Sequence, residues 1–134
     1  MQHILNVCLT QQGELAMTTV TIIIQNAPYK DDNKAWHALR FAGAALTDDM
    51  SGQVHLLDDA VYVGRKEHQV PEGKSTLKNY SPSLLNVVCL CVRACGMAVD
   101  DCGVTEDELI AGIEKGSMKA LAGWVKTSDH VITF

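Results

Sequence analysis

Five cysteines are the residues of this 134-residue chain best suited to chemistry. Four of them lie between Cys89 and Cys102, and the fifth, Cys8, stands apart. An odd count is not typical of a secreted disulfide framework, so the cysteines favour a reducing, cytoplasmic compartment. No lysine or arginine precedes Lys30, and the basic start of a signal peptide is therefore missing.

Cys95 is the strongest candidate nucleophile because of its place in the chain. The segment 87–94 is almost wholly apolar, as in a central strand that is covered on both faces, and Gly96 follows Cys95 directly. If residues 96–101 form a helix, the positive end of its dipole lies next to the sulfur and favours the thiolate, the reactive form. The sequence therefore predicts a reactive thiol at a strand-to-helix junction.

Arg93 and the neighbouring cysteines share one face of this strand, because side chains alternate along a strand. Arg93 either adds positive charge beside Cys95 or pairs with a carboxylate such as Asp58 or Asp59. Cys89 and Cys91 are expected to pack as small buried side chains. We expect no metal site, since adjacent strand cysteines do not curl around an ion and no nearby histidine completes a ligand set.

The other candidate site residues come from the rule that open α/β sheets bind ligands beyond the carboxyl ends of their strands. This rule selects segment 26–29 after the first strand, where Tyr29 could line a pocket, Asp58 and Asp59 after the second, and Cys95 with Gly96 after the third. The first strand-to-helix loop contains no glycine, so a dinucleotide or phosphate-loop site is excluded. No cofactor is expected.

The predicted elements alternate between strands and helices. This order predicts an α/β fold of three layers, with a mainly parallel sheet of about five strands between helices. Thr105 and Glu108 form a capping-box pattern that predicts a helix through Ile113. The expected strands are 20–24, 53–57, 87–94 and 131–134, and the expected helices are 33–48, a short segment ending by Gly64, 105–113 and 118–125.

Composition excludes several classes of protein. Hydrophobic residues make up 47% of the chain, but the longest apolar stretch, 84–92, is far shorter than the roughly 18 residues of a membrane span. The 16 acidic residues outnumber the 11 basic ones, which argues against nucleic acid as a direct partner. His55 and the other histidines are expected to be surface residues or satisfied, partly buried ones.

The segment 94–104 resembles the cysteine motif of DsrE-like sulfur-relay proteins (DsrE, DsrF and TusD type). In that motif an apolar strand ends in a cysteine, and a glycine followed by isoleucine or valine comes eight residues later, as Gly103 and Val104 do after Cys95. Similarity extends to segments 23–29, 57–61 and 128–134. It covers residues 18–134, which we interpret as one DsrE-like domain, with residues 1–17 as an amino-terminal extension.

This resemblance implies a function for Cys95. Family members carry a persulfide on the motif cysteine and pass sulfane sulfur to a cysteine of a partner protein, without metal or organic cofactor. It also implies a cytoplasmic homo-oligomer, a trimer or hexamer, that meets donor and acceptor proteins and no membrane. Two alternatives are a non-catalytic assembly or binding subunit and a thiol redox sensor that uses Cys95 with Cys102.

Overall fold

The computed structural model describes residues 18–29, 33–66 and 90–134. Cys8, Cys89, the predicted extension and most of the polar loop after Gly64 lie outside these ranges. Within the described part of the chain, no helix is both long and apolar enough to cross a membrane.

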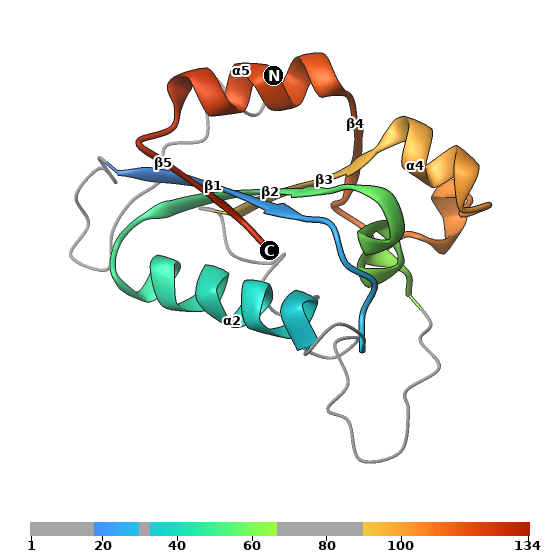
Figure 1. The fold of residues 1–134 in the computed structure, drawn as a ribbon, viewed down its shortest axis with the longest axis horizontal. Helices are drawn as coiled ribbons and strands as arrows, with labels where there is room; N and C mark the ends of the chain where they lie inside the picture. The colour runs from blue at the N-terminus through green and yellow to red at the C-terminus, as the bar shows by residue number, and fades with distance from the viewer. Residues whose placement is uncertain (1–17, 30–32, 67–89) are drawn as a thin grey trace.

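A five-stranded sheet forms the centre of the molecule (Figure 1). Its order is β4-β3-β2-β1-β5, and every pairing is parallel. Helices cover both faces, so the predicted three-layer α/β fold is confirmed. The strands are β1 (Thr19–Ile24), β2 (Ser51–Leu56), β3 (Leu90–Cys95), β4 (Glu114–Gly116) and β5 (His130–Thr133).

The apolar core lies between the sheet and helix α2 (Lys34–Thr47). Alternating residues of β1, β2 and β3 point to this side, where they meet a row of small residues on the helix. The core residues at this interface include Val20, Ile22, Ile24, Val54, Leu56, Leu90, Val92 and Ala94 from the strands, and Ala35, Ala38, Leu39, Ala42 and Ala45 from α2. The same cluster also contains Cys95, at the end of β3.

The opposite face of the sheet is more polar and is covered by helix α5 (Met118–Thr127), as Figure 1 shows. Leu121 and Trp124 are the buried residues of this helix. Beneath it, the hydroxyl of Thr21 donates to Gln53 Oε1 at 3.2 Å and also contacts the hydroxyl of Ser128. This face therefore combines hydrogen-bonded polar side chains with the buried side chains of Leu121 and Trp124.

The predicted helix from Thr105 to Ile113 is wrong. The capping box forms, with Thr105 donating to Glu108, but it opens only a short 3-10 turn, η3 (Glu106–Glu108). Backbone bonds to the preceding segment then redirect the chain: Lys66 N donates to Glu108 O at 2.7 Å, and Ile110 N donates to Gly64 O at 2.8 Å. The segment continues into β4, a short edge strand that the sequence did not predict.

Candidate functional site

Cys95 is the last residue of β3 and the N-cap of helix α4 (Gly96–Asp101). The predicted junction of strand and helix is therefore confirmed. The side chain of Cys95 is 6% exposed, whereas Met97, two residues later, is 75% exposed. Cys95 is thus a buried residue at the carboxyl end of an interior strand.

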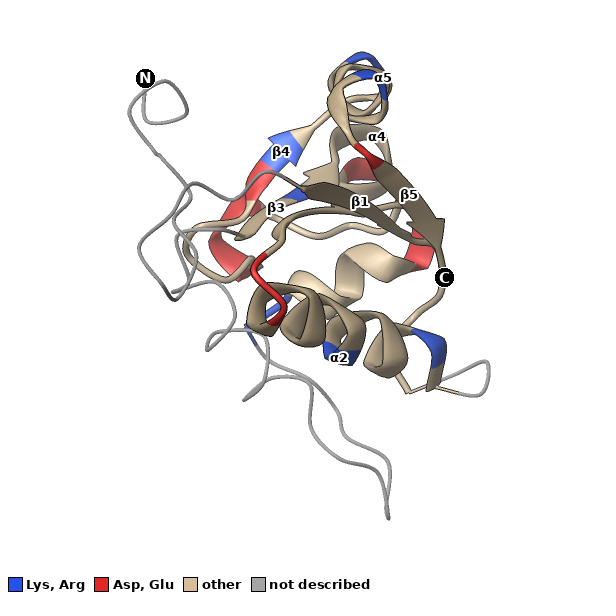
Figure 2. Ribbon diagram, turned by 90° about the vertical axis from the view of Figure 1, so that its left-hand side faces the viewer, with Lys and Arg blue, Asp and Glu red and all other residues tan. Residues whose placement is uncertain are grey.

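Two glycines allow β4 to approach this junction closely. Gly116 pairs with Cys95 across the β3–β4 register, and a Cβ atom added to Gly96 would lie 3.2 Å from Gly116 O. Lys115 of β4 forms an ion pair of 3.4 Å with Asp100 of α4. Lys115 therefore partly neutralises the acidic charge of Asp100, near the end of the cysteine motif. The edge strand β4 carries both Glu114 and Lys115 (Figure 2).

Arg93 lies on the α5 side of the sheet, where its guanidinium stacks 4.3 Å from the centre of the Trp124 ring. The register pairs it with His55 of β2 and Glu114 of β4. Arginine stacks well on aromatic rings because its charge is planar and weakly hydrated. The stacking holds a positive charge on the same strand face as Cys95, two residues away.

Asp59 lies in the 3-10 helix η2 (Asp58–Gly64), and the structure brings it to Cys102. Cys102 Sγ is 3.9 Å from Asp59 Oδ1 and 3.9 Å from the carbonyl oxygen of Asp58. The hydroxyl of Tyr62 donates to the Cys102 carbonyl at 3.0 Å. The pKa of Tyr62 is raised, chiefly by a hydrogen bond with the Cys102 side chain. Asp59 thus lies beside the carboxyl-terminal end of α4, whereas Cys95 lies at the other end of that helix.

Tyr29 and Cys91 take different places. Tyr29 follows β1, which β2 separates from β3, and its half-buried ring packs against the apolar core. Cys91 is half-buried; burial raises the pKa of its thiol, while the charge of Arg93 opposes that effect. Among the described residues, no group of three or more histidine, cysteine or acidic side chains is placed to hold a metal ion.

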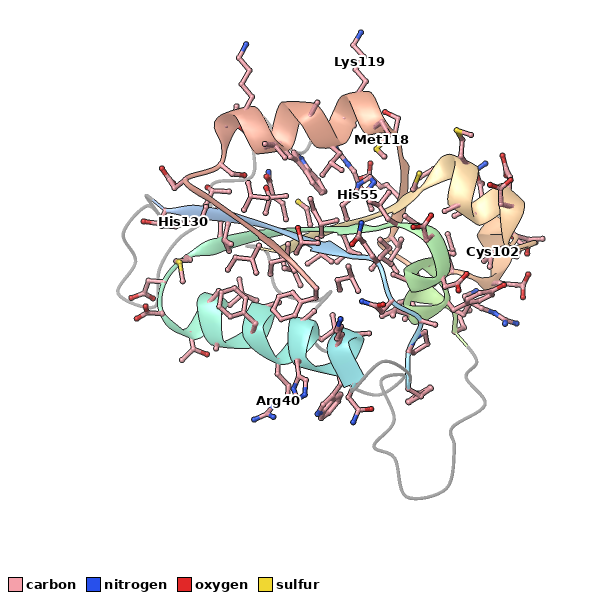
Figure 3. The ribbon with its side chains drawn as sticks, in the orientation of Figure 1. Arg40, His55, Cys102, Met118, Lys119 and His130 are labelled. Atoms are coloured by element: carbon pink, nitrogen blue, oxygen red, sulfur yellow. The ribbon has the colours of Figure 1, made fainter. Side chains whose placement is uncertain are left out.

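His55 was missed by the sequence reasoning, and its expected exposure or satisfaction is wrong. The residue is 0% exposed, and within the described part of the chain neither ring nitrogen has a hydrogen-bond partner. Burial lowers its pKa first and the charge of Arg93 lowers it further. Figure 3 shows the ring in the layer between the sheet and α5, where it meets Trp124 edge to face at a centroid distance of 6.3 Å. The apolar neighbours of His55 in β2 were the available signal of burial.

Comparison with known proteins identifies the family and the fold of this chain. The model of the DsrE/DsrF-like family matches residues 18–134, and the chain belongs to this family. The protein MJ0989 of Methanocaldococcus jannaschii is 38% identical over 116 residues, covering 85% of this chain and 97% of its own. YchN of Escherichia coli is 29% identical over 121 residues, covering 88% of this chain and all of its own.

Solved structures agree with this assignment. The crystal structure of YchN from E. coli has a TM-score of 0.77 at 28% identity and covers 88% of this chain and 100% of that one. MTH1491 from Methanobacterium thermoautotrophicum has a TM-score of 0.68 at 14% identity, which shows likeness of fold alone, and covers 86% of this chain and 98% of that one.

Proposed function

We propose that this protein carries sulfane sulfur as a persulfide on Cys95 and transfers it to a thiol of a partner protein in the cytoplasm. The observation that carries the proposal is the position of Cys95, at the carboxyl end of β3 and directly before α4, in a chain of the DsrE/DsrF-like family. This is the position at which the resemblance to sulfur-relay proteins places the persulfide. Gly96, Arg93 and Lys115 are the neighbours that would shape its surroundings.

The transfer needs only thiol chemistry. An acceptor thiolate attacks the outer sulfur of the Cys95 persulfide, and the bond between the two sulfurs of the persulfide breaks. Its electron pair remains on Cys95 Sγ, which leaves as a thiolate, while the acceptor becomes the new persulfide. The step uses no oxidant and no cofactor.

The burial of Cys95 bears directly on this reaction. A thiol that is 6% exposed offers little surface to an acceptor. In a persulfide, however, the atom that is attacked lies about 2.0 Å beyond Sγ, the length of a sulfur–sulfur bond. Met97, two residues after Cys95 in the sequence, is exposed at the surface. The acceptor would therefore approach over the first turn of α4.

Intact-mass measurement tests the proposal. After incubation with a persulfide donor, the wild-type protein should gain about 32 Da, the mass of one sulfur, which should map to Cys95 and disappear in Cys95→Ser. Cys91→Ser and Cys102→Ser are matched controls that should retain the gain. Sulfur that maps to Cys102 or Cys91 in the wild-type protein would contradict the assignment to Cys95.

The burial of Cys95 also favours a second candidate, a non-catalytic assembly subunit in which this cysteine is a core side chain. In that case Cys95→Ser would leave both the sulfur content and partner binding unchanged. A redox switch fits the geometry less well, because Cys95 and Cys102 cap opposite ends of α4. Seven helical steps separate their Cα atoms by about 10 Å, beyond the roughly 6.8 Å that a disulfide spans.

A further inference from the structure

Met97 and Met118 are the two most exposed large hydrophobic side chains among the described residues, at 75% and 62%. Single exposed apolar side chains are common on protein surfaces and need no explanation. These two, however, occupy matching positions. Each stands two residues after one member of the pair that Cys95 and Gly116 form in the β3–β4 register. The most exposed apolar side chains therefore follow directly on the strand ends that hold the proposed reactive thiol.

The ends of these two strands lie close together. Because β3 and β4 are parallel, α4 and α5 both begin at the same end of the sheet (Figure 1). A Cβ atom added to Gly96 would lie 3.2 Å from the carbonyl oxygen of Gly116. Ser117 caps α5 by accepting a hydrogen bond from the helix backbone at 3.1 Å, so the helix starts at Met118. We call Met97 and Met118, in the first turns of the two helices, the methionine rim.

The charged residues next to the methionine rim balance one another. Lys115 of β4 forms its 3.4 Å ion pair with Asp100, one turn into α4. Of the next exposed charges, Asp101 in α4 is acidic and Lys119 in α5 is basic. An acidic or a basic partner therefore meets equal numbers of like and opposite charges here. An apolar partner, in contrast, would remove methionine surface from water, and the unbranched methionine side chain adapts well to such contacts.

We propose that the methionine rim is the docking surface for the acceptor in sulfur transfer, and that it selects a cysteine flanked by apolar, uncharged side chains. The inference rests on the proposed function and names the chemistry of the partner in it. The transfer step is unchanged: the acceptor thiolate takes the outer sulfur, and the electron pair of the broken bond stays on Cys95 Sγ. Because Cys95 is only 6% exposed, an acceptor that reaches its persulfide must press against the neighbouring surface.

The test measures sulfur transfer from the Cys95 persulfide to three synthetic pentapeptides. Each carries one cysteine, placed between two leucines, two lysines or two glutamates. Loss of about 32 Da from the protein gives the rate. Flanking charges also change the reactivity of the peptide thiol itself, so each rate is divided by the rate of the same peptide with glutathione persulfide, which has no docking surface.

We expect the wild type to prefer the leucine peptide about tenfold over either charged peptide. A tenfold preference corresponds to roughly 55 Å² of apolar surface removed from water, less than two exposed methionines offer. Met97→Ser and Met118→Ser should each lower the preference to about threefold, and the variant with both substitutions should show none, if the two contacts are additive.

Two controls separate docking from a change in the thiol. Val125→Ser alters another exposed apolar residue of α5, two turns beyond Met118, and should keep the full preference. Transfer to reduced glutathione, an acceptor too small to cover both methionines, should stay within about twofold of the wild type in every variant.

Three results would overturn the inference: equal normalised rates for the three peptides in the wild type, a preference for a charged peptide, or a full preference that survives both substitutions. A loss of transfer to glutathione as large as the loss to the leucine peptide would also overturn it, because the substitutions would then act on the thiol and not on docking. Absence of a persulfide on wild-type Cys95, which is measured before any acceptor is added, would instead overturn the proposed function.

Discussion

Replacement of Trp124 by alanine should destabilise the protein by about 4 kcal/mol. Trp124 is 8% exposed and, with Leu121, forms the buried contact of α5 with the sheet. Truncation of a core tryptophan costs about 3–5 kcal/mol. We take about 3 kcal/mol because this ring is not completely buried, and add about 1 kcal/mol for the lost stacking of Arg93 at 4.3 Å.

Urea unfolding followed by far-ultraviolet circular dichroism measures this loss. Fluorescence is less suitable, since the chain has two tryptophans and the variant would keep only Trp36. Domains of this kind have a free energy of unfolding of about 5–15 kcal/mol, so a loss of about 4 kcal/mol should leave a folded but visibly weakened protein.

Val125→Ala is the matched control, because it shortens the neighbouring side chain on the same helix. Val125 is 40% exposed, and its truncation should change the free energy of unfolding by less than about 0.5 kcal/mol. A loss below about 1 kcal/mol in Trp124→Ala, or equal losses in the two variants, would refute the packing of α5 that this reasoning assumes.

Three further predictions concern single residues of the site and its surroundings. Gly116→Ala should lower the free energy of unfolding by about 1–2 kcal/mol, since its Cβ would lie 3.1 Å from His55 Cε1. Gly123→Ala in α5 should raise the free energy of unfolding by about 0.5–1 kcal/mol, because a Cβ at Gly123 would have no atom within 4 Å. Denaturant titration compares the two variants. Burial and then the nearby Arg93 lower the pKa of His55 from 6.5, so the unfolded chain binds a proton at His55 before the folded chain does. The free energy of unfolding should therefore fall as the pH drops through 6.5 toward the folded pKa. Urea titrations at several pH values should show this loss of stability in the wild type and not in His55→Phe. Hydrogen bonds from the Thr105 backbone and then its side chain lower the pKa of Glu108, so Thr105→Ala should raise that pKa only partly in a carboxyl NMR titration, because the backbone N–H remains.

The local elements of this fold were accessible from the sequence. The β-branched run of β1 and the apolar run of β3 predict buried strands, and the spacing of Met118, Leu121 and Val125 predicts α5. The position of Cys95 between strand and helix follows from the same patterns. These features depend on residues close in the chain, where side-chain alternation and helical periodicity act directly.

Long-range pairing decided what the sequence could not. The capping box at Thr105 predicts a helix, yet backbone bonds to Gly64 and Lys66 limit it to one turn. Asp59, a candidate partner of Arg93, instead lies beside Cys102.

The sequence by itself determined that a single cysteine ends an interior strand of a parallel α/β sheet, and which family this motif resembles. Only the tertiary structure decided that His55 reaches across β3 to Gly116, and that neither of its ring nitrogens has a hydrogen-bond partner among the described residues. The physical reason is that the contact depends on the register of three strands far apart in the chain and on the missing side chain of Gly116. No local pattern of residues carries that information.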